Sequence, residues 1–165
     1  MQILNEFENA LILLNKPEGI TSFSAIQQVK RMCNIKKIGH SGTLDIYATG
    51  LLVLCTGRLT KLTQYFLNHD KVYECQIQLG KNTDTNDLTG IILEEFLFDQ
   101  IKEQKILEVV NSFTGKISQL PPDFSALKIK GKRASDLKRQ GKEVTLTPRM
   151  VEIKHIDIIS IDIEK

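Results

Sequence analysis

Residues 39–50 contain the side chains best suited to chemistry, because three glycines and two threonines surround a single carboxylate, that of Asp45. Glycine lets the backbone bend sharply and lets a ligand approach closely, and a threonine hydroxyl can hydrogen-bond a carboxylate and hold its rotamer. A loop of this kind can present one reactive acid to a ligand. Clusters of Gly, Thr and Asp between apolar runs also form plain turns, so the spacing alone leaves both interpretations open.

The same loop is similar to the catalytic motif of the TruB family of tRNA pseudouridine synthases, which reads Gly-His-Thr/Ser-Gly-Thr/Ala-Leu-Asp-Pro-x-Ala-Thr-Gly. The clear exception is Ile46, which stands where the family has proline. The resemblance continues in order along nearly the whole chain. The further stretches that fit family motifs are residues 14–17 with Gly19, Thr21 and Ser22; Thr60, Lys61 and Tyr65; residues 70–73; Leu79 and Gly80; residues 83–85, Asp87 and Gly90; and residues 121–128 with Gly131 and Lys132.

The resemblance implies a reaction, the isomerisation of the T-loop uridine at tRNA position 55 to pseudouridine. The bond between ribose and the uracil nitrogen breaks, the base turns while it stays trapped, and it is rejoined through carbon, so no cofactor and no metal is required. By the same resemblance Asp45 is the catalytic nucleophile, His40 lies against the RNA at the flipped-out nucleotide, and Tyr73 packs on the uracil. Asp84 is assigned to a charge network around the nucleophile.

Each of these assignments has a structural alternative. Tyr73 lies on the apolar face of an alternating run, where a tyrosine is commonly a core residue, although base stacking on such a ring contributes about 1 to 3 kcal/mol. Asp84 is equally explained as a turn residue. His40, placed next to a glycine and close to a second one, is harder to explain as a core residue. His69 and His155 match no motif position and are interpreted as surface or structural residues.

Basic residues are concentrated in one segment of the chain. Residues 128–142 contain seven basic side chains and one acid, Asp136, so the segment carries +6 and the remainder −4 of a formal net charge of +2. Such a run is often only a solvated face. Here it resembles a mobile RNA-gripping loop at about residues 120–148, and a basic loop suits a polyanion because phosphate neutralisation releases counterions. The predicted RNA-binding residues are Lys128, Lys130, Lys132 and Arg133, and the predicted partner is the T-stem and loop of tRNA.

Two departures from the family pattern bear on activity. Ile46 removes the fixed φ angle of proline beside Asp45, which is expected to make the loop less preorganised. The sequence also reaches Lys165 before a strand that in this family carries a Lys-Gly-x-Tyr-x-Arg motif, whose arginine pairs with the catalytic aspartate. Residues 1–165 are therefore predicted to be a partial catalytic domain without the C-terminal RNA-binding domain. An exposed sheet edge would then favour self-association. The alternative function is that of a catalytically impaired homologue that binds or folds RNA.

Composition and periodicity predict an ordinary cytoplasmic domain. With 41% apolar and 25% charged residues in 165, one globular domain is expected, without a membrane span or a signal sequence. The three cysteines are odd in number and lie among apolar residues, which predicts small core side chains in a reducing compartment rather than disulfides or zinc ligands. Residues 82–90 resemble a calcium loop, but Leu88 and Thr89 occupy positions that need a ligand and a glycine, which excludes calcium.

The pattern of apolar residues predicts an α+β fold, with a mixed, largely antiparallel sheet and flanking helices as in pseudouridine synthases, truncated at the C-terminus. The expected strands are residues 10–14, 51–55, 71–79 and 151–163. The expected helices begin at a Thr21 or Ser22 cap, extend over residues 59–68 and 99–115, and include a short turn at residues 133–140.

Overall fold

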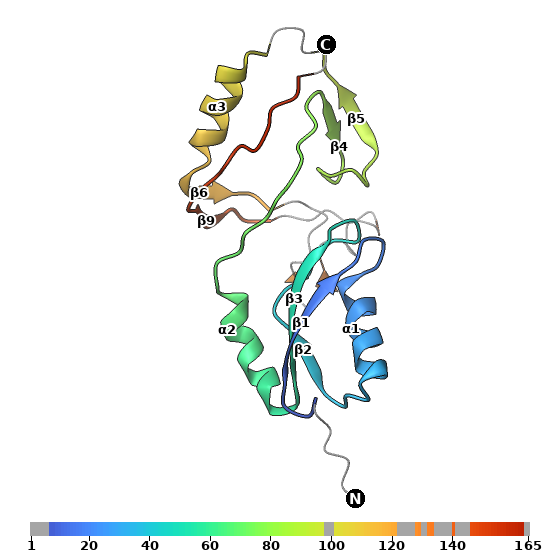
Figure 1. Cartoon of the computed structure of the whole chain (residues 1–165). Coiled ribbons are helices and arrows are strands. Elements are labelled where there is room, and N and C mark those ends of the chain that lie inside the picture. Colours follow the sequence, from blue (N-terminus) through green and yellow to red (C-terminus); the bar gives the residue numbers. More distant parts are fainter. Residues whose placement is uncertain are drawn as a thin grey trace, which may run out of the picture. The chain divides into compact units, whose positions relative to one another are not determined.

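The computed structural model describes residues 7–97, 101–121, 128–129, 132–133, 140 and 146–163 (Figure 1). The chain divides into two compact units, Met1–Glu74 (unit 1) and Cys75–Lys165 (unit 2). Unit 1 contains β1 (Leu11–Lys16), α1 (Ser22–Met32), β2 (Ile38–His40), β3 (Gly50–Thr56), the 3-10 helix η1 (Gly57–Leu62) and α2 (Thr63–Leu67).

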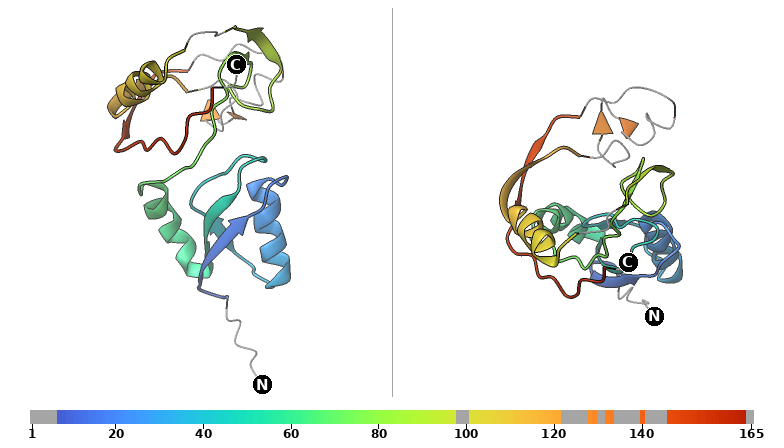
Figure 2. Two further views of the ribbon diagram at one scale, coloured as in Figure 1. Left: turned by 45° about the horizontal axis from the view of Figure 1, so that its top comes forward. Right: turned by 90° about the horizontal axis from the view of Figure 1, so that it is seen from above.

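Unit 1 is built on a three-stranded antiparallel sheet in the order β1-β3-β2. Helices α1 and α2 lie on opposite sides of this sheet (Figures 1 and 2). The register pairs Ile12 with Leu54 and Leu14 with Leu52, which places four apolar side chains on one face. Leu52 and Leu54 on this face form the buried cluster with Ile26 of α1. The sheet and α1 therefore bury a shared core.

The local sequence explains why α1 begins and ends where it does. The hydroxyl of Thr21 accepts a hydrogen bond of 3.0 Å from the amide of Ser24, so Thr21 is the N-cap. Lys30 and Arg31 lie in the last turn, where their positive charges stabilise the helix by interacting with the negative end of its dipole. This confirms the predicted cap.

Unit 2 is assembled from short antiparallel pairs and one helix. Strand β4 (Lys81–Thr83) pairs with β5 (Ile92–Glu95), and β6 (Gly115–Gln119) pairs with β9 (Arg149–Ile153). Two-residue strands β7 (Lys128–Ile129) and β8 (Lys132–Arg133) form a third pair. The helix is α3 (Glu103–Ser112). Among the described residues the buried hydrophobic cluster lies in unit 1.

The α+β class and the antiparallel pairing are confirmed, but several expected elements are shorter or absent. The strand expected over residues 71–79 does not form, because no described residue pairs with it; Val72 is 99% and Tyr73 71% exposed. An alternating pattern makes a strand only where a partner supplies the ladder. The strand expected over residues 151–163 is reduced to β9, and the sheet is divided into four small ones. Of the turn expected at residues 133–140, Arg133 lies in β8 and residues 134–139 lie outside the described residues.

Burial also differs from the sequence pattern. Of the cysteines, Cys55 is buried, Cys33 is half-buried and Cys75 is exposed, so only Cys55 is the core residue that was expected. Burial raises the pKa of the Cys55 thiol above its ordinary value, which keeps it protonated at neutral pH. Within α1, Phe23 and Met32 are exposed although they share the apolar stripe. No helix in the described part of the chain is long and apolar enough to cross a membrane.

Gly57 provides a test of this packing. Its φ is +53°, and an added Cβ would lie 1.9 Å from the carbonyl oxygen of Glu8. Gly57→Ala should therefore lower the free energy of unfolding by about 3 kcal/mol or more, the sum of left-handed strain and overpacking. Gly19→Ala is the matched control, because Gly19 also has a positive φ, of +83°, but open space around its Cβ. Urea unfolding followed by circular dichroism should show the smaller loss for Gly19→Ala; equal losses would contradict the steric argument.

Candidate functional site

Asp45 lies in the segment that joins β2 to β3, at the end of the sheet where Lys16 pairs with Gly50. The residue before it, Leu44, packs against the buried cluster. The hydroxyl of Ser22 accepts a hydrogen bond of 2.9 Å from the Leu44 amide and donates one of 3.0 Å to the Leu44 carbonyl. Two bonds to one backbone unit fix Leu44 against the first turn of α1.

The residue after Asp45 is held by a second pair of donors. The carbonyl of Ile46 accepts hydrogen bonds from the amide of Gly19, at 2.8 Å, and from the Nζ of Lys16, at 3.3 Å. These contacts constrain the backbone at the position where the family has proline. We infer that tertiary contacts compensate here for the missing proline ring.

Lys16 has an environment that is unusual for a lysine. Its side chain is fully buried, and its Nζ also donates to the carbonyls of Pro17, at 2.9 Å, and Ile20, at 2.8 Å. An ammonium group has three N–H donors, and three carbonyls accept them, so the cost of burying the charge is offset by a complete set of hydrogen bonds. Sequence reasoning placed Lys16 and Ser22 in a motif but missed that they anchor the loop. A lysine at the end of an apolar strand was the sequence feature that could have indicated a buried Lys16.

The carboxylate of Asp45 is exposed between these two anchored neighbours. No group within the described residues donates a hydrogen bond to it, so the suggested contact with a threonine hydroxyl is not formed. A carboxylate on a fixed backbone, with no partner in the described part of the chain, is available to an incoming ligand. Nowhere in the described part of the chain do three His, Cys, Asp or Glu side chains gather to hold a metal ion.

His40 belongs to the same segment and ends β2. Its ring Nδ1 bonds to the carbonyl of Gly42, and because a carbonyl can only accept, Nδ1 is the donor. The imidazole is thereby pinned to the loop while Nε2 stays available. His40 therefore lies at the start of the segment that carries Asp45, and no described contact joins the two side chains.

Of the other predicted site residues, Tyr73 belongs to unit 1 and Asp84 to unit 2. Tyr73 is exposed, and no described contact joins it to Asp45. Asp84 belongs to unit 2, where its Oδ1 accepts a hydrogen bond of 2.8 Å from the amide of Ile91. Gly90 packs so closely on Asp84 that a Cβ would lie 2.5 Å from Oδ1. The local role of Asp84 is thus the turn, and its role in a network around Asp45 stays a prediction.

The predicted RNA-binding residues lie at the β7–β8 pair or outside the described residues. Lys128 pairs through its backbone with Arg133, and Lys132 pairs with Ile129. Their side chains are not among those described, and Lys130 lies outside the described residues altogether. The RNA-gripping assignment therefore stays a prediction.

Comparison with known proteins identifies the family. Residues 30–165 match the model of the TruB family pseudouridylate synthase (N terminal domain). The chain belongs to the TruB family of pseudouridine synthases. It is 46% identical over 154 residues to the tRNA pseudouridine synthase B of Endomicrobium trichonymphae, which covers 93% of this chain and 67% of the relative. It is 41% identical over 155 residues to the enzyme of that name from Clostridium tetani (strain Massachusetts / E88), which covers 94% of this chain and 54% of the relative.

Solved structures agree on the fold. This TruB-family chain aligns with a chain of the crystal structure of a Cbf5-Nop10-Gar1 complex with a TM-score of 0.58 and 22% identity, over 94% of this chain and 36% of that chain. The chain spans between half and about two thirds of the length of the curated relatives it matches. The family and the α+β class are therefore established for this chain.

Lys16 and Lys71 form a matched pair for testing the anchor. Both donate from Nζ to three backbone carbonyls, but Lys16 is fully buried whereas Lys71 is exposed. Lys16→Met should lower the free energy of unfolding by roughly 3 kcal/mol or more, because three carbonyls lose the charged donor that is buried against them. Lys71→Met should cost less than about 1 kcal/mol, because water replaces the ammonium. Urea unfolding of both variants measures the difference, and similar losses would refute a special role for Lys16.

Proposed function

We propose that this TruB-family chain isomerises the T-loop uridine at position 55 of tRNA to pseudouridine, with Asp45 as the nucleophile. The observation that carries the proposal is the position of Asp45: both neighbours are fixed by hydrogen bonds, and no described residue pairs with the carboxylate itself. The names of the relatives support a tRNA substrate.

The reaction needs little more than a positioned carboxylate and a bound base. Asp45 attacks the nucleotide at the ribose or at the pyrimidine ring, and the bond between ribose C1′ and uracil N1 breaks. The base turns, a bond forms between C1′ and C5, the bond between Asp45 and the nucleotide breaks, the C5 proton leaves to solvent, and N1 takes up a proton. Atoms and electrons balance within the nucleotide, because the product is an isomer of the substrate.

The target base must first leave its stack, which costs a few kcal/mol. In this proposal the ring of Tyr73 stacks on the extruded uracil, and this interaction, worth about 1 to 3 kcal/mol, offsets part of the cost of unstacking. His40 contacts the RNA beside the flipped-out nucleotide, with Nε2 available because Nδ1 is bonded to Gly42. Asp84 completes a charge network around the nucleophile. The exposed position of Tyr73 leaves its ring accessible to a base.

Asp45→Asn tests the nucleophile. The amide keeps the shape of the side chain but is a poor nucleophile, so turnover should fall below detection while RNA binding stays within about twofold of the wild-type value. The measurement is tritium release from C5-labelled uridine in an isolated T stem-loop, because C5 loses its hydrogen when the new bond forms.

The control is Asp162→Asn, which removes an exposed carboxylate far along the sequence from the loop and should leave tritium release unchanged. Retained turnover in Asp45→Asn would rule out the proposed nucleophile. A wild-type protein that folds and binds the stem-loop but releases no tritium would instead support the alternative, an RNA-binding homologue without turnover.

The gripping segment is tested by replacing two lysines together, Lys130→Ala with Lys132→Ala. If they neutralise phosphates, stem-loop affinity should fall, and the slope of log affinity against log salt should become shallower by about 1 to 2. Fluorescence anisotropy at several salt concentrations measures both quantities. Unchanged affinity and slope would show that this segment does not hold the RNA.

A further inference from the structure

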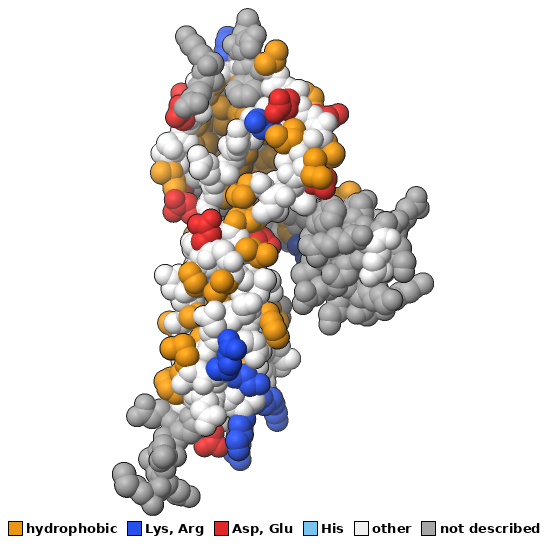
Figure 3. Space-filling model, turned by 90° about the vertical axis from the view of Figure 1, so that its right-hand side faces the viewer, with side chains coloured by type: hydrophobic (Ala, Val, Ile, Leu, Met, Phe, Trp, Pro, Cys, Tyr) orange, Lys and Arg blue, Asp and Glu red, His pale blue; other side chains and the backbone are white. Residues whose placement is uncertain are grey.

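The end of unit 1 that lies away from Asp45 carries a cluster of positive charge. Four exposed basic residues come together there: Arg31 at the end of α1, Lys36 and Lys37 in the following turn, and Arg58 in η1. We call these four residues the basic end. Figure 3 shows lysine and arginine side chains gathered at the lower end of unit 1 in that view.

Backbone hydrogen bonds bring these residues from separate segments to one place. The Gly57 amide, beside Arg58, donates to the carbonyl of Lys37 at 3.0 Å. The Asn34 amide donates to the carbonyl of Arg31 at 3.3 Å. The cluster is therefore built into the fold at the junction of β3, η1 and the turn after α1, and does not depend on chance side-chain positions.

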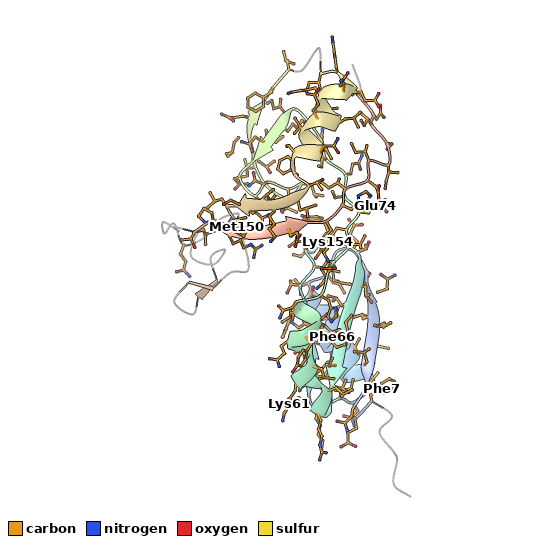
Figure 4. All side chains as sticks on the ribbon, turned by 90° about the vertical axis from the view of Figure 1, so that its left-hand side faces the viewer. Phe7, Lys61, Phe66, Glu74, Met150 and Lys154 are labelled. Atoms are coloured by element: carbon orange, nitrogen blue, oxygen red, sulfur yellow. The ribbon has the colours of Figure 1, made fainter. Side chains whose placement is uncertain are left out.

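A hollow of about 310 Å³ opens beside Lys36 and Lys37 of the basic end. Lys36 and Lys37 line it together with Phe7, Ile35 and Gly57, and Glu8 is the acidic residue of the lining. Figure 4 shows the labelled Phe7 and Lys61 at this same end of the unit.

The charges of the basic end have no ion-pair partner in the part of the chain that the structure describes. Uncompensated cations on a curved surface attract an anionic polymer, because each phosphate neutralised releases condensed counterions. A patch of this kind, whose described hollow has Glu8 as its acid, fits a nucleic-acid backbone.

Its distance from Asp45 indicates which part of the RNA would reach it. The Asp45 loop follows the Lys16 end of the sheet, whereas the basic end follows the Thr56 end of β3. Seven residues of β3 separate the two, which is roughly 20 Å at the rise of a strand. Six or so stacked nucleotides of a duplex strand cover the same distance. Phosphates at the basic end thus lie well beyond the target base.

We propose that the basic end is a second RNA-contacting surface, which binds backbone phosphates of the tRNA outside the T stem-loop. The inference rests on the proposed function, because it takes tRNA as the substrate. It adds a surface of unit 1 to the segment of residues 128–133 that sequence analysis assigned to RNA. The same surface would give full-length tRNA an advantage over a minimal substrate.

The test compares two RNAs and two triple variants of the full chain. The first variant combines Lys36→Ala, Lys37→Ala and Arg58→Ala, and leaves Lys61, a family motif residue, in place. The matched control removes the same charge from unit 2 with Lys81→Ala, Lys102→Ala and Lys105→Ala. All substituted residues of the first variant are exposed, and circular dichroism with a urea midpoint verifies that each variant folds.

Affinity for an unmodified full-length tRNA transcript and for the isolated T stem-loop is measured by fluorescence anisotropy at several salt concentrations. The basic-end variant should bind full-length tRNA about tenfold more weakly, with a salt slope shallower by about 2 to 3, and should bind the stem-loop within about twofold of wild type. The control variant should match wild type on both RNAs.

The outcomes separate this inference from the proposed function. Equal weakening on both RNAs would overturn it, because the surface would then contact the stem-loop itself. Unchanged binding of full-length tRNA would overturn it as well, while tritium release from the stem-loop by the same variant would leave the proposed function standing. A wild-type protein that binds neither RNA would overturn both.

Discussion

The buried ammonium group of Lys16 is the interaction on which the candidate site depends. Its three carbonyl partners come from three places in the chain: Pro17, directly after β1; Ile20, at the entrance to α1; and Ile46, beside Asp45. A buried charge is tolerated only when its donors are all satisfied, so the three segments must come together for the unit to fold. The contacts that allow unit 1 to fold around Lys16 therefore also place the backbone beside Asp45.

Ser22 completes this arrangement from the other side. It is buried in the first turn of α1, and it holds both polar groups of the Leu44 backbone. The apolar side chain of Leu44 reaches the same core that α1 covers, so packing and hydrogen bonding fix one residue together. Asp45 is left as the exposed residue between two constrained ones. The backbone of the proposed nucleophile is thus held in place before substrate binds, which lowers the entropy cost of positioning it.

The two units differ in how much they bury. Unit 1 contains the core cluster of Ile26, Leu52 and Leu54, whereas among the described residues of unit 2 many large apolar side chains are exposed, such as Ile77 and Leu97. Unit 2 is held locally instead, as in the turn where the Asp87 carboxylate accepts three hydrogen bonds from Thr85 and Thr89. The two features of unit 1 that we propose to act on RNA therefore rest on a packed scaffold, with the Asp45 loop at one end of its sheet and the basic end at the other.

The sequence by itself determined the family, the α+β class, the capped helix α1 and the strands β1 and β3, because short motifs and local periodicity depend only on neighbouring residues. It also predicted the site at the Asp45 loop. It also singled out His40 in the same loop. The prediction of a strand over residues 71–79 was wrong, because an alternating pattern indicates which side chains a strand could bury but not whether a partner strand exists. Only the tertiary structure decided that Lys16 and Ser22 anchor the loop, that contacts to Ile46 act where proline is missing, and that Arg31, Lys36, Lys37 and Arg58 form one surface. Those facts depend on hydrogen bonds and packing between segments far apart in the chain, and no local pattern encodes which distant groups will meet.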